Sequence, residues 1–272
     1  MNTFRVSFIV TSYLICAGLL MIFDKSAAQS YDEWLRSSLG FYIDKREKQL
    51  ICELLAPREG ERLLDIGCKT GNRLQLFKRQ GCDVTGIEVS PAMLERTRLR
   101  LGDRADLYLG SAEDLPFSDN EFDVVTLMTA LEFSDNPERA IDEAIRVSRG
   151  RVFIGILNRY STATKGRRTT GIFSSAISDF GFWKIRTMIK RTLSDTLLRW
   201  GSVVFFPLGW YPFAERIEEW IPSMKNPFGS FLGFAFPVVY SHMTVQDPLK
   251  ESLKVRAAGR QHIPGTARET KK

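Results

Sequence analysis

The feature that most constrains this chain is a buried-strand pattern that runs directly into a glycine turn. At 63–72 the sequence reads Leu-Leu-Asp-Ile-Gly-Cys-Lys-Thr-Gly-Asn, and a helical pattern follows at 72–80. A second predicted strand covers 83–87, and the acid Glu88 stands directly after it. A strand, a glycine turn, a helix and an acid at the tip of the next strand form the front half of a nucleoside-binding α/β unit.

Strand and helix patterns alternate from 61 to 157, which is typical of a parallel sheet covered by helices. Two later β-rich segments have no long helix between them, which indicates an antiparallel pair at one edge of the sheet. We therefore predict an α/β fold, Rossmann-like, with a seven-stranded, mostly parallel sheet, helices on both faces and an antiparallel edge pair. The predicted strands lie at 63–66, 83–87, 104–109, 122–128, 151–157, 198–206 and 230–239.

Both ends of the chain differ in composition from its middle. The apolar run at 6–23 is just long enough to cross a bilayer, and a cleaved signal, a membrane anchor and a mis-assigned start all stay open. Lysine and arginine outnumber acids near the C-terminus. This composition fits a solvated tail and also fits a segment that contacts an anionic partner. We expect an N-terminal segment at 1–28, one domain at 29–240 and a basic tail at 241–272.

The residue types available exclude several kinds of site. The glycine spacing is Asp65-x-Gly67-x-x-x-Gly71, which is neither the dinucleotide pattern Gly-x-Gly-x-x-Gly nor a P-loop. The chain has two histidines and four separate cysteines without a Cys-x-x-Cys pair, so we expect no metal site.

Four motifs, in order along the chain, resemble those of class I S-adenosylmethionine (SAM)-dependent methyltransferases. The first is the stretch at 63–72, and the second is Gly-Ile-Glu-Val-Ser-Pro-Ala-Met-Leu at 86–94. The third and fourth are Gly-Ser-Ala-Glu-Asp-Leu-Pro-Phe at 110–117 and Phe-Asp-Val-Val at 122–125. The subgroup they resemble most contains quinone-biosynthesis and other small-molecule methyltransferases. The resemblance is detailed over 31–157 and holds as an architecture to about 239.

This resemblance implies SAM as the cofactor and gives roles to residues of the motifs. Asp65, Gly67 and Gly71 would form the loop around its methionine part. Glu88 would accept hydrogen bonds from both ribose hydroxyls, and Val89 would pack on the adenine.

The same resemblance places the adenine edge and the transferred methyl. Ala112 would meet the adenine edge through its backbone, with Ser111 beside it, while Thr129 and Leu131 would lie near the methyl. No catalytic residue is implied, and Cys68 is a small turn residue rather than a nucleophile because it lacks an activating histidine. The predicted cofactor-binding residues are Asp65, Gly67, Cys68, Lys69, Gly71, Glu88, Val89, Ser111, Ala112, Glu113 and Thr129.

Three residues depart from the family pattern. Lys69 replaces the usual middle glycine; its amine would either stay in solvent or reach the SAM carboxylate. Ser111 stands where this subgroup usually has an aspartate for the adenine amino group. Phe133 replaces a frequent histidine, which leaves no evident general base in that segment.

The expected reaction is methyl transfer by in-line displacement to a small-molecule or lipid-like acceptor. Glu132, Asn158 and Tyr160 are weak candidates for acceptor contact, and each is better explained as structural. The aromatic and basic helix pattern at 180–192 would either lie on a membrane or pack on the sheet with its charges in water.

Two other functions compete with this one. A SAM-binding protein without transferase activity would explain the changes at Lys69 and Ser111. An RNA methyltransferase would use the basic tail, but the chain has no Asn-Pro-Pro-Tyr-type motif and no recognisable RNA-binding module, so we expect no nucleic-acid partner. We expect a cytoplasmic enzyme, with membrane anchoring through residues 6–23 as the open alternative.

Overall fold

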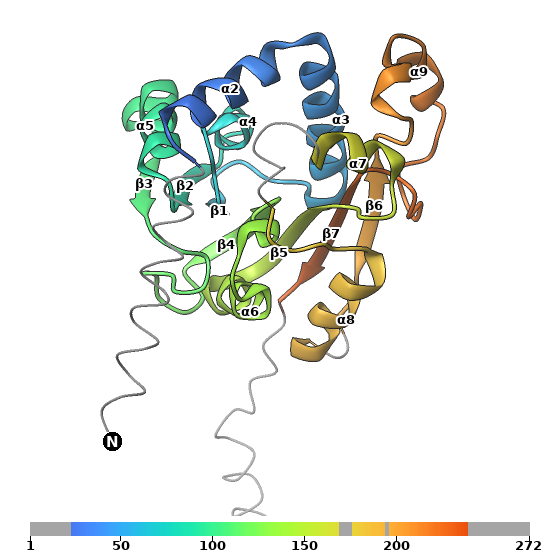
Figure 1. Ribbon diagram of the computed structural model, residues 1–272. Helices are drawn as coiled ribbons and strands as arrows, with labels where there is room; N and C mark the ends of the chain where they lie inside the picture. The colour runs from blue at the N-terminus through green and yellow to red at the C-terminus, as the bar shows by residue number, and fades with distance from the viewer. Residues whose placement is uncertain (1–22, 169–175, 194–195, 239–272) are drawn as a thin grey trace, which may run out of the picture. The chain divides into compact units, whose positions relative to one another are not determined.

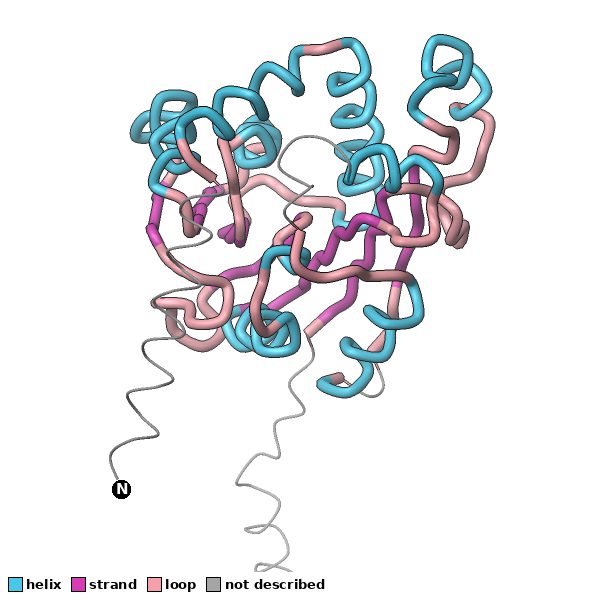
Figure 2. The backbone as a smooth tube through the Cα atoms, viewed as in Figure 1, coloured by secondary structure: helices cyan, strands magenta, loops and turns pink. Residues whose placement is uncertain are grey.

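A seven-stranded sheet forms the centre of the computed structural model, which describes residues 23–168, 176–193 and 196–238 (Figure 1; Figure 2). The order of strands across the sheet is β3-β2-β1-β4-β5-β7-β6. The predicted fold class is therefore confirmed. The strands span β1 Arg62–Ile66, β2 Asp83–Glu88, β3 Asp106–Leu109, β4 Phe122–Met128, β5 Ser148–Leu157, β6 Arg199–Val203 and β7 Phe231–Pro237.

The direction of the strands fixes where a ligand can bind. β1 to β5 pair in parallel, whereas β7 is antiparallel to both of its neighbours, β5 and β6. β6 consequently runs in the same direction as β1. The chain moves outward from β1 to β3 and then returns to β4 on the other side of β1, so the strand order reverses there. In open α/β sheets, ligands bind outside the carboxyl ends of the strands at such a reversal.

Helices cover both faces of the sheet, as the sequence predicts. Apolar side chains of α3, α4 and α5 form one core cluster with the sheet, and those of α6 and α8 form another (Figure 1). The helices span α2 Lys25–Arg36, α3 Ser38–Leu55, α4 Asn72–Arg79, α5 Pro91–Leu101, α6 Pro137–Val147, α7 Thr162–Arg168, α8 Phe182–Thr192 and α9 Tyr211–Glu218, with short 3-10 turns η1 Gly102–Arg104, η2 Leu131–Phe133 and η4 Leu208–Trp210.

The central strands show why their sequences are apolar without interruption. Successive side chains point to opposite faces of a sheet. Leu63 and Val124 accordingly pack under α3 and α4, while Leu64 and Val125 pack under α6. All four side chains are fully buried. Each such burial contributes about 1.5–3 kcal/mol relative to exposure, so both faces favour this arrangement.

The N-terminal part of the domain begins earlier than the sequence patterns suggest. α2 starts at Lys25, where Asp24 caps the helix by accepting from the Ala27 N–H at 2.8 Å. Phe23 is buried, and its ring meets that of Phe133 edge to face at 5.0 Å between centroids. Residues 23–28, which the sequence analysis placed in the N-terminal segment, therefore pack on the domain.

The region between β5 and β6 contains one helix that the sequence patterns did not predict. α7 has small and polar residues in place of an apolar stripe, and it is held where Thr164 hydrogen-bonds to Ser230. In α8, Ile185 and Ile189 are fully buried in the core, and Trp183 is exposed. α8 therefore packs on the sheet, which is the second of the two arrangements considered for 180–192.

The terminal predictions lie largely outside the described residues. Of the apolar run at 6–23, only Phe23 is among the described residues. The basic tail at 241–272 lies wholly outside them. Across 23–168, 176–193 and 196–238, no helix combines the length and the apolar character needed to span a membrane. Within the same ranges, no group of His, Cys, Asp and Glu residues is arranged to hold a metal ion.

Candidate functional site

The glycine turn after β1 is tightly fixed in an unusual backbone conformation. Gly67, Lys69 and Gly71 all have positive φ, at 72°, 52° and 75°. A Cβ on Gly67 would lie 2.9 Å from the Cβ of Ala130, so a side chain does not fit there. Thr97 of α5 donates to the Lys69 carbonyl at 2.6 Å and thereby holds the turn in place.

Three of the predicted cofactor-binding residues, Asp65, Cys68 and Gly71, do not line the pocket beside this turn. Asp65 is buried and accepts from the Thr126 hydroxyl at 2.7 Å; burial raises the pKa of Asp65 to about 6. Cys68 is buried in the core, and burial also raises the pKa of its thiol. Gly71 lies against Thr97, whose Cγ2 would be 2.6 Å from an added Cβ.

Glu88 connects the turn to the next helix. Its two carboxylate oxygens accept from the backbone N–H groups of Lys69, at 2.9 Å, and Ser90, at 3.0 Å. Ser90 in turn caps α5 and donates to the Phe23 carbonyl at 2.6 Å. Burial raises the pKa of Glu88, and the two backbone N–H donors act against that rise.

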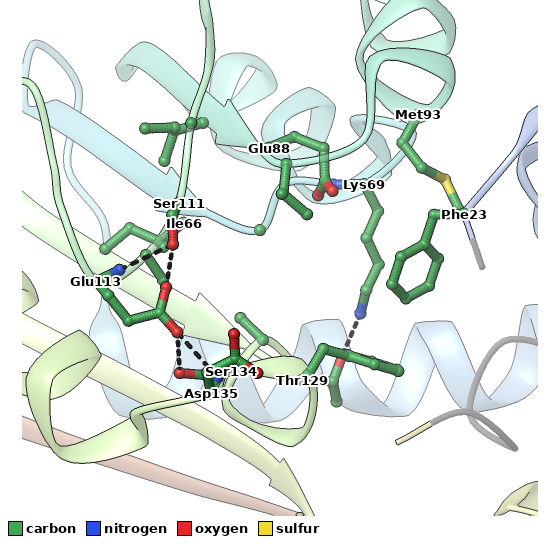
Figure 3. Close-up of a pocket in the computed structure, with 17 residues that line it drawn as sticks. Phe23, Ile66, Lys69, Glu88, Met93, Ser111, Glu113, Thr129, Ser134 and Asp135 are labelled. Carbon is green, nitrogen blue, oxygen red and sulfur yellow. Dashed lines mark hydrogen bonds between the residues drawn. The ribbon is translucent and has the colours of Figure 1, made fainter. Parts of the chain in front are cut away.

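A pocket opens where β1, β2 and β4 end, and it brings together most of the predicted residues (Figure 3). The space between its walls is about 720 Å³ with open solvent included. The predicted residues that line it are Gly67, Lys69, Glu88, Val89, Ser111, Ala112, Glu113 and Thr129, and the further lining residues include Phe23, Ile87, Met93, Phe133, Ser134 and Asp135.

The Lys69 side chain turns into this pocket and not into solvent. The residue is 6% exposed, and its ammonium donates to the Thr129 hydroxyl and to the Met128 carbonyl, the latter at 3.3 Å (Figure 3). The interpretation that leaves the amine in water is therefore wrong. Burial, and next to it the charge of the Arg73 guanidinium, lower the pKa of Lys69 to about 7, although nearby carboxylates, foremost that of Glu132, act in the opposite direction.

The carboxylate of Glu113 lines the pocket beside Ser111, the position at which the sequence motif leads one to expect an aspartate. Glu113 accepts hydrogen bonds from the hydroxyls of Ser111 and Ser134 and from the Asp135 N–H (Figure 3). Burial and the charge of Glu113 raise the pKa of Asp135. The pocket thus regains, two residues along the chain, an acid that the motif lacks at Ser111.

Residues that the sequence analysis missed form the apolar wall. Phe23 and Met93 lie on the side of the pocket where α2 meets α5, and Phe133 packs against Phe23 (Figure 3). Phe23 is separated from every motif, and the signal that could have found it is the Asp24 cap, which marks the start of a helix directly after it.

The weak candidates for acceptor contact do not line the pocket. Glu132 is fully buried and accepts from the Leu157 N–H at 2.6 Å. Asn158 donates to the carbonyls of Pro227 and Gly229. Tyr160 is 71% exposed, and Leu131, expected near the methyl, is fully buried outside the lining.

The chemistry of this lining fits SAM. Glu88 can still accept hydroxyl hydrogens because each carboxylate oxygen has two lone pairs. Ile87, Val89 and Ala112 offer apolar contact suited to a base. The charged residues that line the pocket are three acids, Glu88, Glu113 and Asp135, and one base, Lys69. This excess of acids favours a cationic ligand such as a sulfonium.

Comparisons with known proteins agree with the site. Residues 64–154 match the methyltransferase domain family. A demethylmenaquinone methyltransferase of Renibacterium salmoninarum is 32% identical over 184 residues, which cover 67% of this chain and 69% of that protein. A ubiquinone/menaquinone biosynthesis C-methyltransferase of Roseobacter denitrificans is 33% identical over 147 residues, covering 51% of this chain and 58% of that protein.

A solved structure shows the same fold. A SAM-dependent methyltransferase of Thermotoga maritima, described as a possible histamine N-methyltransferase, superposes with a TM-score of 0.64 at 22% identity. The match covers 81% of this chain and 99% of that one. With its motifs, its sheet and its pocket, this chain belongs to the class I SAM-dependent methyltransferases.

Proposed function

We propose that this enzyme methylates a ring carbon of a small, lipid-like quinol. The observation that carries the proposal is the aromatic wall of Phe23 and Phe133, which faces the same pocket as Lys69 and Thr129. Such a wall suits a flat, apolar ring. The names of the quinone-biosynthesis relatives point to the same class of acceptor.

For the cofactor, we propose that Glu88 binds the ribose hydroxyls and that Val89 and Ala112 contact the adenine. The position of Glu88 at the tip of β2 supports this role, as does its place in the wall of the pocket. Gly67 lets the backbone approach the methionine part, since any side chain there would meet Ala130. Asp65, Cys68 and Gly71 act through the turn and not by contact.

When bound, SAM supplies a methyl group that its sulfonium has already made electrophilic. The protein then has to hold the ring in line and raise the nucleophilicity of its carbon. Loss of a hydroxyl proton from the quinol raises the nucleophilicity of the ring carbon. We propose that the Lys69 amine takes this proton, because it lies in the pocket and its pKa of about 7 leaves it partly neutral at neutral pH.

Replacing Glu88 tests the cofactor site. In Glu88→Ala, SAM binding measured by calorimetry is expected to weaken about 100-fold, because two hydrogen bonds to a charged acceptor are lost. Glu95→Ala, which removes an exposed acid from α5, is the matched control and should leave the affinity unchanged. Thermal unfolding of both variants shows whether the fold is retained. An unchanged SAM affinity in folded Glu88→Ala would refute the assignment.

Replacing Lys69 separates a base from a cofactor contact. Lys69→Gly suits the positive φ and removes a cation from the pocket, so SAM affinity should stay the same or increase. The kcat should fall about 100-fold. In the unmodified enzyme kcat should rise with pH through about 7, as Lys69 loses its proton, and this limb should vanish in the variant. Lys78→Ala on α4 serves as the control.

Two results would contradict this role of Lys69. A large loss of SAM affinity in Lys69→Gly would show that the ammonium contacts the cofactor. A pH limb that persists in the variant would show that another group takes the proton.

The reaction itself is tested with a short-chain demethylmenaquinol and SAM labelled with carbon-13 in its methyl group. We expect the label on a ring carbon, with loss of the ring hydrogen from that carbon, as shown by NMR of the isolated product. Label on oxygen, or no transfer to a quinol while SAM binds normally, would refute the proposal that a ring carbon of a quinol is the acceptor.

A further inference from the structure

An aromatic surface on α9 has no role in the site described above. Trp210, Phe213, Ile217 and Trp220 are 66%, 81%, 56% and 88% exposed. Within α9, Phe213 and Ile217 are four residues apart and project from the same side of the helix, while Trp210 directly precedes α9 and Trp220 follows it. We call these four residues the α9 aromatic face. Clusters of exposed large apolar side chains mark interaction sites in soluble domains.

This face is displayed by a helix that is fixed to the domain. On an adjacent side of the helix, Ala214 and Glu218 are buried. The Glu218 carboxylate accepts from the Tyr42 hydroxyl of α3 and from the Phe205 N–H. The aromatic residues are therefore held outward by packing beneath them.

The charges around the face are arranged asymmetrically. Glu215 and Glu219 lie on the far side of the helix wheel, away from the aromatic residues, whereas Arg216 flanks them. Lys225, close in the chain, is also exposed. An anionic surface pressed against the aromatic face would thus meet cations first and leave both acids in water.

The segment that carries the face lies at the same edge of the sheet as the pocket. β6 runs in the direction of β1, so the segment after it, which contains α9, leaves from the carboxyl edge (Figure 1). The pocket lies where β1, β2 and β4 end, at that edge. The exposed Arg159 and Lys165, which follow β5, add two more cations there.

We propose that the α9 aromatic face rests on the surface of an anionic lipid bilayer. Tryptophan and phenylalanine place apolar rings at the boundary between headgroups and acyl chains, and basic residues beside them pair with anionic headgroups. This contact turns the carboxyl edge, and with it the pocket, toward the membrane. Its purpose rests on the proposed function, since a lipid-like quinol resides in the bilayer.

Vesicle flotation of the full chain tests the contact. We expect binding to vesicles of phosphatidylglycerol and phosphatidylcholine to weaken about tenfold or more in the double variant Phe213→Ser, Trp220→Ser. The matched control is Trp183→Ser on α8, which removes a tryptophan that is 67% exposed elsewhere and should leave binding unchanged. Pure phosphatidylcholine vesicles should bind the unmodified protein more weakly, as should high salt.

Three outcomes would overturn the proposal. One is equal vesicle binding by the double variant, and another is an equal loss in the Trp183→Ser control. The third is a dimer, measured by light scattering without lipid, that the double variant loses, because the face would then bind a second copy.

Activity separates this contact from the proposed reaction. The double variant should keep the kcat for a water-soluble quinol without vesicles. If the unmodified protein binds vesicles through the face but methylates no quinol, the proposed membrane contact is supported and the proposed quinol acceptor is refuted.

Discussion

The site depends on one carboxylate that ties three segments together. Glu88 accepts from the N–H of Lys69 in the glycine turn and from the N–H of Ser90 at the start of α5. Ser90 then binds the carbonyl of Phe23, which brings the N-terminal segment to the pocket. The acid that is proposed to bind the ribose thus also shapes the turn and, through Ser90, positions the aromatic wall.

The consequence is a pocket in which charge and conformation are coupled. The Lys69 N–H can reach Glu88 because the residue adopts positive φ, and the same backbone conformation directs its side chain toward Thr129. The ammonium is then buried where the carboxylates of Glu132 and Glu88 act on it. The positive φ of Lys69, which costs about 1–2 kcal/mol of backbone strain, thereby places a titratable amine in the pocket.

Much of this could be read from the sequence because it is local. The continuous apolar runs of β4 and β5 follow from helices on both faces, and Glu88 was placed by the end of its strand. Contacts between distant segments could not be read in this way. Phe23 looked like the end of an apolar run, and α7 carries no apolar stripe to reveal it.

The glycine motif illustrates a second limit. A motif does not separate residues that touch a ligand from those that support the turn, so Asp65, Cys68 and Gly71 were grouped with Gly67, although they lie outside the lining. The direction of the Lys69 side chain depends on the positive φ of this residue, and the sequence alone does not show that angle.

The most direct test of the account is a crystal structure with S-adenosylhomocysteine. We predict that the Glu88 carboxylate lies within hydrogen-bond distance of both ribose hydroxyls, while the Lys69 amine stays at Thr129 beside Phe23 and Phe133, clear of the amino-acid part of the ligand. A ribose bound away from Glu88, or an amine paired with the ligand carboxylate, would contradict it.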